Sequence, residues 1–271
     1  MKIKIFITTY NNIDDVNNCV KSLLDSDVTK ENYEINVLNN HTNFICHYPL
    51  VKVYNNQTRP DFSTGHLSRT WNQCIINGFK DISSPDCDIL VTLQDDVILK
   101  PNWFSLILPH IQKYSFMEVG GGDIMCVYTP KAIYNVGLWD ERFCNIGYQE
   151  ADYFLRQLVY NPDIVSINDY CHSRVHNPIY ASSRAREIDN EFLRVPAKNS
   201  TRVANSNLSL AYHGHSENMF RSKWSVPPEN WNVESILNNI KTPNVNSYVL
   251  YPYFEYKLNT NRLRDMQKFN F

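Results

Sequence analysis

An α/β fold with a mostly parallel central sheet is predicted from two features of the first 100 residues. Short apolar runs typical of buried strands alternate with segments whose apolar residues recur at helical spacing. The strand segments are almost continuously apolar, as in sheets that helices cover on both faces. With 271 residues, 43% of them hydrophobic and 13% aromatic, the chain is long enough for one large domain with an extension.

The predicted elements follow one another in strand–helix order. The first strand is interrupted by Tyr10-Asn11-Asn12, after which Asp14 and Asp15 lie in the first turn of a helix, where carboxylates complement the helix dipole. The expected strands cover 3–8, 33–38, 51–54, 88–93 and 124–128, and the expected helices cover 14–24, 67–79, 130–136 and 149–158. Residues 181–210 are polar and arginine-containing, which favours an extended loop.

Three of the predicted strands end in polar residues. The sequence TTYNN ends the first strand, NNHT ends the second, and QDD follows the strand 88–93. Ligands of open parallel sheets bind beyond the carboxyl ends of the strands. We therefore expect these three segments to meet at one binding site.

Composition excludes several classes of function. A formal net charge of −2 gives no electrostatic support for nucleic-acid binding, and no apolar run is long enough for a membrane span. Seven cysteines, without a C-x-x-C pair or a signal-peptide pattern, are expected to be reduced thiols of a cytoplasmic protein. Dinucleotide-binding, P-loop and nucleophile-elbow motifs are absent from the sequence. The composition leaves open whether the protein forms a homo-oligomer.

Two acidic pairs are the candidates for chemistry. Asp95 and Asp96 follow a strand, where adjacent carboxylates can hold Mn²⁺ or Mg²⁺, although a solvated turn explains them equally well when taken alone. Glu150 and Asp152 open a predicted helix and include a candidate general base; an ordinary acidic helix start is the alternative.

Histidines provide candidate metal ligands. His213 and His215 flank Gly214, and we expect them on a loop, from which either can bind a metal; positions i and i+2 do not share a helix face. His172 and His176 are a competing pair, which would be neighbours if their segment were helical.

Taken in order, these elements resemble a family 2 type glycosyltransferase of the GT-A fold, over residues 1–180 and more loosely over 205–226. Asn39 stands where the family has Asp, and Gln94 replaces the first carboxylate of its D-x-D element. The matching segments are Thr9-Tyr10-Asn11, Leu38 to Thr42, Asn56 to Ile75, Gln94-Asp95-Asp96, Gly137 to Phe143, Gln149 to Arg156, and His213 or His215 before Lys223-Trp224-Ser225.

The resemblance implies an inverting, metal-dependent transfer of a sugar from a nucleotide-diphosphate sugar, with a UDP-sugar favoured, to a hydroxyl of a glycan or another acceptor. By residue, it implies Glu150 as general base with Asp152 steering it, and Trp139 and Tyr148 as candidate surfaces for stacking on a sugar. It also implies a nucleotide site of Thr8, Tyr10, Asn39, Arg69, Asn72 and Asp95, and a Mn²⁺ or Mg²⁺ site of Asp96 with His213 or His215.

The resemblance further divides the chain into a nucleotide-sugar-binding and catalytic core, 1–180, and an irregular, partly helical extension or lid, 181–271. A catalytically weakened nucleotide- or carbohydrate-binding module of the same fold is the alternative, because of the departures at Asn39 and Gln94. A sugar-1-phosphate nucleotidyltransferase is a third option, but it would need a basic, glycine-rich phosphate loop near the N-terminus, and TTYNN offers none.

Overall fold

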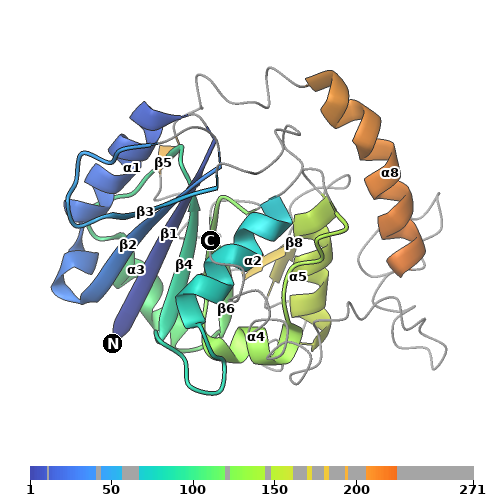
Figure 1. The fold of residues 1–271 in the computed structure, drawn as a ribbon. Helices are drawn as coiled ribbons and strands as arrows, with labels where there is room; N and C mark the ends of the chain where they lie inside the picture. Colours follow the sequence, from blue (N-terminus) through green and yellow to red (C-terminus); the bar gives the residue numbers. More distant parts are fainter. Residues whose placement is uncertain are drawn as a thin grey trace.

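A six-stranded sheet forms the centre of the protein (Figure 1). The computed structural model describes residues 1–10, 12–40, 44–56, 67–119, 123–143, 148–160 and 206–224, and the strands 170–172, 180–182 and 193–194. The strand order is β3-β2-β1-β4-β7-β6. The bounds are β1 Lys2–Thr9, β2 Asn32–Asn39, β3 Lys52–Asn55, β4 Ile89–Gln94, β6 Phe116–Val119 and β7 Met125–Tyr128.

Strand direction within the sheet is mostly parallel, as predicted. β3, β2, β1 and β4 pair in parallel, whereas β7 pairs antiparallel with both β4 and β6. Because β7 runs the opposite way, Met125 at its start pairs with Leu93 near the end of β4. Residues that precede β7 therefore lie at the same edge of the sheet as residues that follow β1, β2 and β4.

Helices cover both faces of the sheet, which gives two hydrophobic cores. The alternation of strand side chains divides β1 between them: Ile3, Ile5 and Ile7 face one core and Phe6 faces the other. The first core is covered by α1 (Ile13–Leu24), the 3₁₀ helix η1 (Asp27–Lys30) and α3 (Trp103–Ile111), and the second by α2 (Leu67–Phe79), α4 (Pro130–Val136) and α5 (Tyr148–Tyr160).

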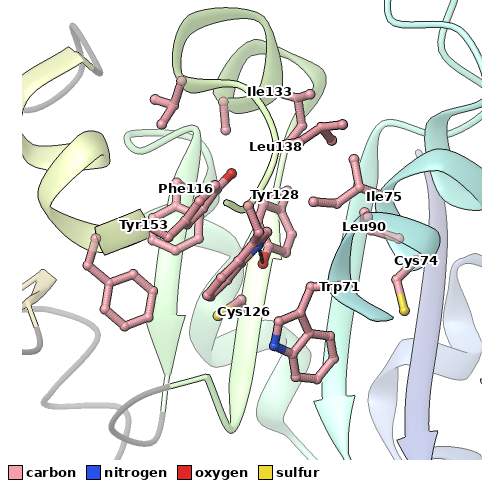
Figure 2. Close-up of a cluster of buried hydrophobic side chains, with 14 of the residues drawn as sticks. Trp71, Cys74, Ile75, Leu90, Phe116, Cys126, Tyr128, Ile133, Leu138 and Tyr153 are labelled. Atoms are coloured by element: carbon pink, nitrogen blue, oxygen red, sulfur yellow. Dashed lines mark hydrogen bonds between the residues drawn. The ribbon is translucent and has the colours of Figure 1, made fainter. Parts of the chain in front are cut away.

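The second core brings α2 close to β4 (Figure 2). Gly78 makes this approach possible, because a Cβ atom built there would lie 2.6 Å from Cδ1 of Leu90. Trp71, Cys74 and Ile75 of the same helix are fully buried against the sheet. The apolar residues whose spacing predicted a helix over 67–79 thus form the face of α2 that contacts the strands.

The part of the chain after residue 160 departs from the predictions. His213-Gly214-His215 was expected on a loop, which is wrong: all three lie within α8 (Ser206–Trp224). β8 (Tyr170–His172) pairs with β9 (Tyr180–Ser182), so His172 is on a strand rather than a helix. β10 (Leu193–Arg194) lies within the expected loop 181–210 and pairs with β5 (Val97–Ile98).

Helix α8 is held on the second core by its C-terminal end. Phe220 and Trp224 are buried there, with the Phe220 ring centroid 5.5 Å from that of Tyr148 on α5. The described portion of the chain contains no helix that is both long and apolar enough to cross a membrane. His176 and the region after Trp224 lie outside the described residues.

Candidate active site

The carboxyl ends of β1, β2 and β4 meet, as their polar endings predicted. Thr9 at the end of β1 pairs in register with Asn39 at the end of β2. On its other side, the Thr9 hydroxyl donates a 2.6 Å hydrogen bond to Oδ2 of Asp95, just beyond β4. Three segments that are far apart in sequence thereby form one continuous polar edge.

Asp95 and Asp96 are largely enclosed at this edge, with 8% and 6% of their surfaces exposed. Burial and the charge of Asp96 together raise the pKa of Asp95 to about 6, against the hydrogen bonds from Thr9 and Asn12. Removal of a carboxylate from water without a cation causes such a shift. A cation at this edge would favour the charged form of Asp95.

A chain of hydrogen bonds joins β4 to the start of α5. Gln94 donates from Nε2 to Oδ1 of Asp123 at 2.8 Å, and the backbone N–H of Asp123 donates to Oε2 of Glu150 at 3.3 Å. Asp123 immediately precedes the turn into β7, and Glu150 lies in the first turn of α5. Glu150 is thus connected through Asp123 to Gln94, the residue that precedes Asp95 and Asp96.

Gln149, next to Glu150, is an unsatisfied buried amide. It is 2% exposed, and neither its Nε2 nor its Oε1 has a hydrogen-bond partner within the described part of the chain. A buried amide without partners costs about 1–3 kcal/mol. Unsatisfied groups of this kind are unusual in folded proteins and mark places where a ligand or water completes the bonding.

A set of side-chain amides lies beside the ends of β2 and β3. Asn39 donates from Nδ2 to Oδ1 of Asn55 at 2.8 Å. Asn56 donates to Oδ1 of Asn40 at 2.9 Å and to Oε1 of Gln73 at 3.0 Å. These neutral donors and acceptors can read the polar edge of a nucleobase without requiring a charge.

The other predicted nucleotide-binding residues differ from one another in burial and in their contacts. Thr8 is buried in β1 and donates to the Leu93 carbonyl at 3.3 Å, while Tyr10 follows the strand and is partly buried. Arg69 is half exposed on α2 and pairs with Glu141 at 3.3 Å. Asn72 is fully buried, and its side-chain amide hydrogen-bonds other residues of the chain.

Asn72 fixes the segment 139–141 against α2. Its Oδ1 accepts from the Trp139 backbone N–H at 2.8 Å, and its Nδ2 donates to the Trp139 carbonyl at 3.0 Å and to Glu141 at 2.9 Å. Trp139 itself is buried and stacks on Tyr153, with ring centroids 4.3 Å apart. These contacts hold the segment 139–141 in place, and Trp139 belongs to the hydrophobic core.

Asp152 belongs to a buried ionic network away from Glu150. Its carboxylate accepts from Nε of Arg156 at 3.1 Å, from Nε1 of Trp224 at 2.9 Å and from Nζ of Lys223 at 2.7 Å. Lys223 also contacts Asp140 at 2.8 Å. Burial lowers the pKa of Lys223, an effect that both carboxylates oppose. The carboxylate of Asp152 thus joins α5 to α8.

His213 and His215 lie on α8, but their side chains are outside the described residues. The described residues bring no group of three or more His, Cys, Asp or Glu side chains together as a metal site. Asp95 and Asp96 alone still fit a divalent cation of the Mg²⁺ type. Such an ion takes one or two protein carboxylates and completes its shell with water and substrate phosphates.

Sequence reasoning assigned no site role to three residues of this edge: Asp123, Asn55 and Asn56. Asp123 was hidden because it contacts residues 29, 27 and 52 positions away, which no local pattern records. The predicted strand 124–128 was the available signal. Had its antiparallel direction been known, the residue before it would have been placed at the carboxyl ends of β1 and β4.

Comparisons with known proteins yield structural similarity only. No family model and no curated protein matches the sequence. One similar solved structure is S. aureus TarS 1–349 in complex with UDP (10% identity, TM-score 0.39, 58% of this chain and 56% of that chain). Another is S. aureus TarS (10%, 0.44, 99% and 54%), so this chain spans little more than half the length of either TarS chain. A third is the mannosyltransferase PcManGT from Pyrobaculum calidifontis in complex with GDP-Man and Mn²⁺ (9%, 0.44, 98% and 84%).

Proposed function

We propose that the protein is a glycosyltransferase that moves a sugar from a nucleotide-diphosphate sugar to an acceptor hydroxyl with inversion. The observation that carries the proposal is the single hydrogen-bonded edge that contains an acidic pair, a candidate base and a set of amides. Thr9 contacts Asp95, and Gln94 leads through Asp123 to Glu150. Asn39 lies at the same edge and would read the base, with uracil favoured because an amide both donates and accepts.

In the proposed reaction, the acceptor oxygen attacks the anomeric carbon and the bond from that carbon to the diphosphate breaks. Glu150 takes the proton of the acceptor hydroxyl, and the nucleoside diphosphate leaves with the bonding electron pair. A Mn²⁺ or Mg²⁺ ion held by Asp96 and Asp95 would neutralise the charge on that leaving group. One displacement inverts the anomeric configuration. Gln149 would hydrogen-bond the acceptor or an ordered water.

The division of the chain into a core, 1–180, and an extension, 181–271, is kept as part of this proposal. Two contacts join the extension to the core: β10 pairs with β5, and Trp224 of α8 donates to Asp152 of α5. In the proposed role, the extension closes the donor site from one side.

Two experiments test the proposal. UDP-sugars and GDP-sugars are screened with Mn²⁺ for release of nucleoside diphosphate, and Glu150→Gln is compared with the wild type. The variant should bind UDP with unchanged affinity by calorimetry and lose about 10²- to 10⁴-fold in kcat, the usual contribution of a general base. Glu34→Gln is the matched control, because Glu34 lies on β2 and pairs with Lys52 rather than with this edge. Full activity of Glu150→Gln would exclude Glu150 as the base.

A binding module is the second candidate, favoured by the amide at position 94. Gln94 removes the carboxylate from the first position of the D-x-D element, and its Nε2 is engaged by Asp123. Binding of UDP with Mn²⁺ but no turnover across the whole donor panel would favour the module over the enzyme.

A further inference from the structure

Asp123 connects three elements of the candidate site. Its carboxylate accepts from Nε1 of Trp71 on α2 at 2.8 Å and from Nε2 of Gln94 on β4 at 2.8 Å. Its backbone N–H donates to Glu150 on α5. The residue is 4% exposed, so it is enclosed by the groups that it joins. Figure 2 shows Trp71 on α2, beside the strands of the sheet.

The hydrogen bonds of the side chain fix its orientation. An indole N–H can only donate, so Trp71 requires an acceptor at Oδ2 of Asp123. The second oxygen takes the donor of Gln94. With both oxygens held, the backbone N–H of the same residue has a fixed direction, and that direction is toward Oε2 of Glu150.

The identity of residue 94 fits this arrangement. A carboxylate at position 94 would face the carboxylate of Asp123 across the 2.8 Å contact, and two like charges so close cannot both stay ionised without cost. Glutamine supplies a donor at the same place and adds no charge. Gln94 and Asp123 therefore act as a matched pair.

We propose that Asp123 is a positioning residue that sets the place of Glu150 relative to the end of β4. The inference rests on the proposed function, because it assigns Asp123 a task only if Glu150 acts as base. It goes beyond that function by naming the residue that aligns the base and by explaining why residue 94 is an amide. Asp123 itself need not contact the substrate.

The test uses four variants of the full chain with the UDP-sugar or GDP-sugar that the wild type hydrolyses fastest. Asp123→Ala removes both side-chain bonds and should lower kcat about 100-fold, the effect of a misplacement of about 1 Å, with KM unchanged. Gln94→Glu places two carboxylates in contact and should lower kcat in the same way. Gln94→Glu with Asp123→Asn restores a hydrogen bond with donor and acceptor exchanged, and should recover most of kcat.

The fourth variant, Asp86→Asn, controls for loss of stability. Asp86 binds Lys2, Lys4 and Lys80 at the opposite, amino-terminal end of β1, so its loss should lower the melting temperature and leave kcat per folded molecule unchanged. If Asp123→Ala changes only the melting temperature, or if the double variant does not recover kcat, the positioning role is wrong while the proposed function stands. If the wild type turns over no donor of the panel, the positioning role and the proposed function are both wrong.

Discussion

The buried network around Asp152 gives the sharpest prediction about the fold. Two carboxylates, Asp140 and Asp152, face two buried cations, Arg156 and Lys223, and each of these four side chains is at most 2% exposed. Asp140 also binds the more exposed Arg142 at 2.6 Å. Asp152→Asn removes one negative charge and leaves both cations buried. Its amide oxygen can still accept from Trp224, but its NH₂ group then faces another donor at Arg156.

The expected loss follows from the burial of these charges. Removal of one partner from a buried ion pair costs about 3–5 kcal/mol, because the remaining charge stays out of water. Against a total unfolding free energy of about 5–15 kcal/mol, this is a large fraction. Glu34→Gln breaks the exposed pair with Lys52 and should cost less than about 1 kcal/mol. Urea unfolding followed by circular dichroism measures both variants.

A second substitution tests the pairing directly. Lys223→Met alone leaves Asp152 and Asp140 without the cation that they share, whereas Asp152→Asn with Lys223→Met removes one negative and one positive charge together. The double variant should therefore be more stable than the sum of the single losses, by about 0.5–3 kcal/mol.

Two results would refute this reasoning. A loss below about 1 kcal/mol for Asp152→Asn would mean that the charge is not buried as described. A variant of wild-type stability without activity would return Asp152 to the role of base. We expect the opposite separation: Glu150→Gln loses turnover and keeps stability, and Asp152→Asn loses stability.

Three further predictions concern packing, pH and metal. Gly78→Ala should destabilise the protein, because overpacking against Leu90 costs about 1–3 kcal/mol and the helix gains at most about 1 kcal/mol. Adding Leu90→Val should relieve part of this loss. A Gly78→Ala variant more stable than the wild type would contradict the close approach of α2 to β4. Burial would raise the pKa of Asp140, but its cationic neighbours outweigh burial and hold the pKa below its ordinary value. Stability should therefore fall as the pH drops through the acid range in which a free Asp takes up its proton, and equal slopes for wild type and Asp140→Asn in urea titrations would argue against it. Asp96→Asn should abolish the part of the stabilisation by UDP that depends on Mn²⁺. Binding of UDP and Mn²⁺ together, at 100-fold excess over Kd, stabilises the folded protein by about 2.7 kcal/mol. A variant that keeps the full Mn²⁺-dependent thermal shift would remove Asp96 from the metal site.

Local patterns in the sequence predicted most of the sheet and its helices. The apolar runs at 3–8 and 88–93 became the centre of β1 and β4, and the helices predicted over 67–79 and 130–136 have those bounds in the structure. These elements bury a continuous run or a single stripe of apolar residues, so their own residues carry the information. The meeting of the polar strand ends also followed from sequence, because parallel strands end at one edge.

Helix α8 shows where local patterns fail. Gly214 and the polar residues around it weaken the helical pattern, and the segment contains no continuous apolar stripe. The described contacts that hold it are tertiary: Phe220 enters the core, and Lys223 and Trp224 bind Asp152, which lies far away in the sequence. A sequence alone gives these residues no reason to be helical.

The division of tasks between the two acidic residues of α5 was likewise decided by the tertiary structure. By sequence, Glu150 and Asp152 are equivalent carboxylates two positions apart in one helix start. Because α5 turns about 100° per residue, they face different surroundings: Glu150 meets Asp123 at the sheet edge, and Asp152 meets the cations of α5 and α8. The sequence by itself therefore determined most of the sheet, its polar edge and the acidic candidates. Only the tertiary structure, through the reversed direction of β7 and the docking of α8, decided which carboxylate meets Asp123 at the sheet edge and which one joins α5 to α8.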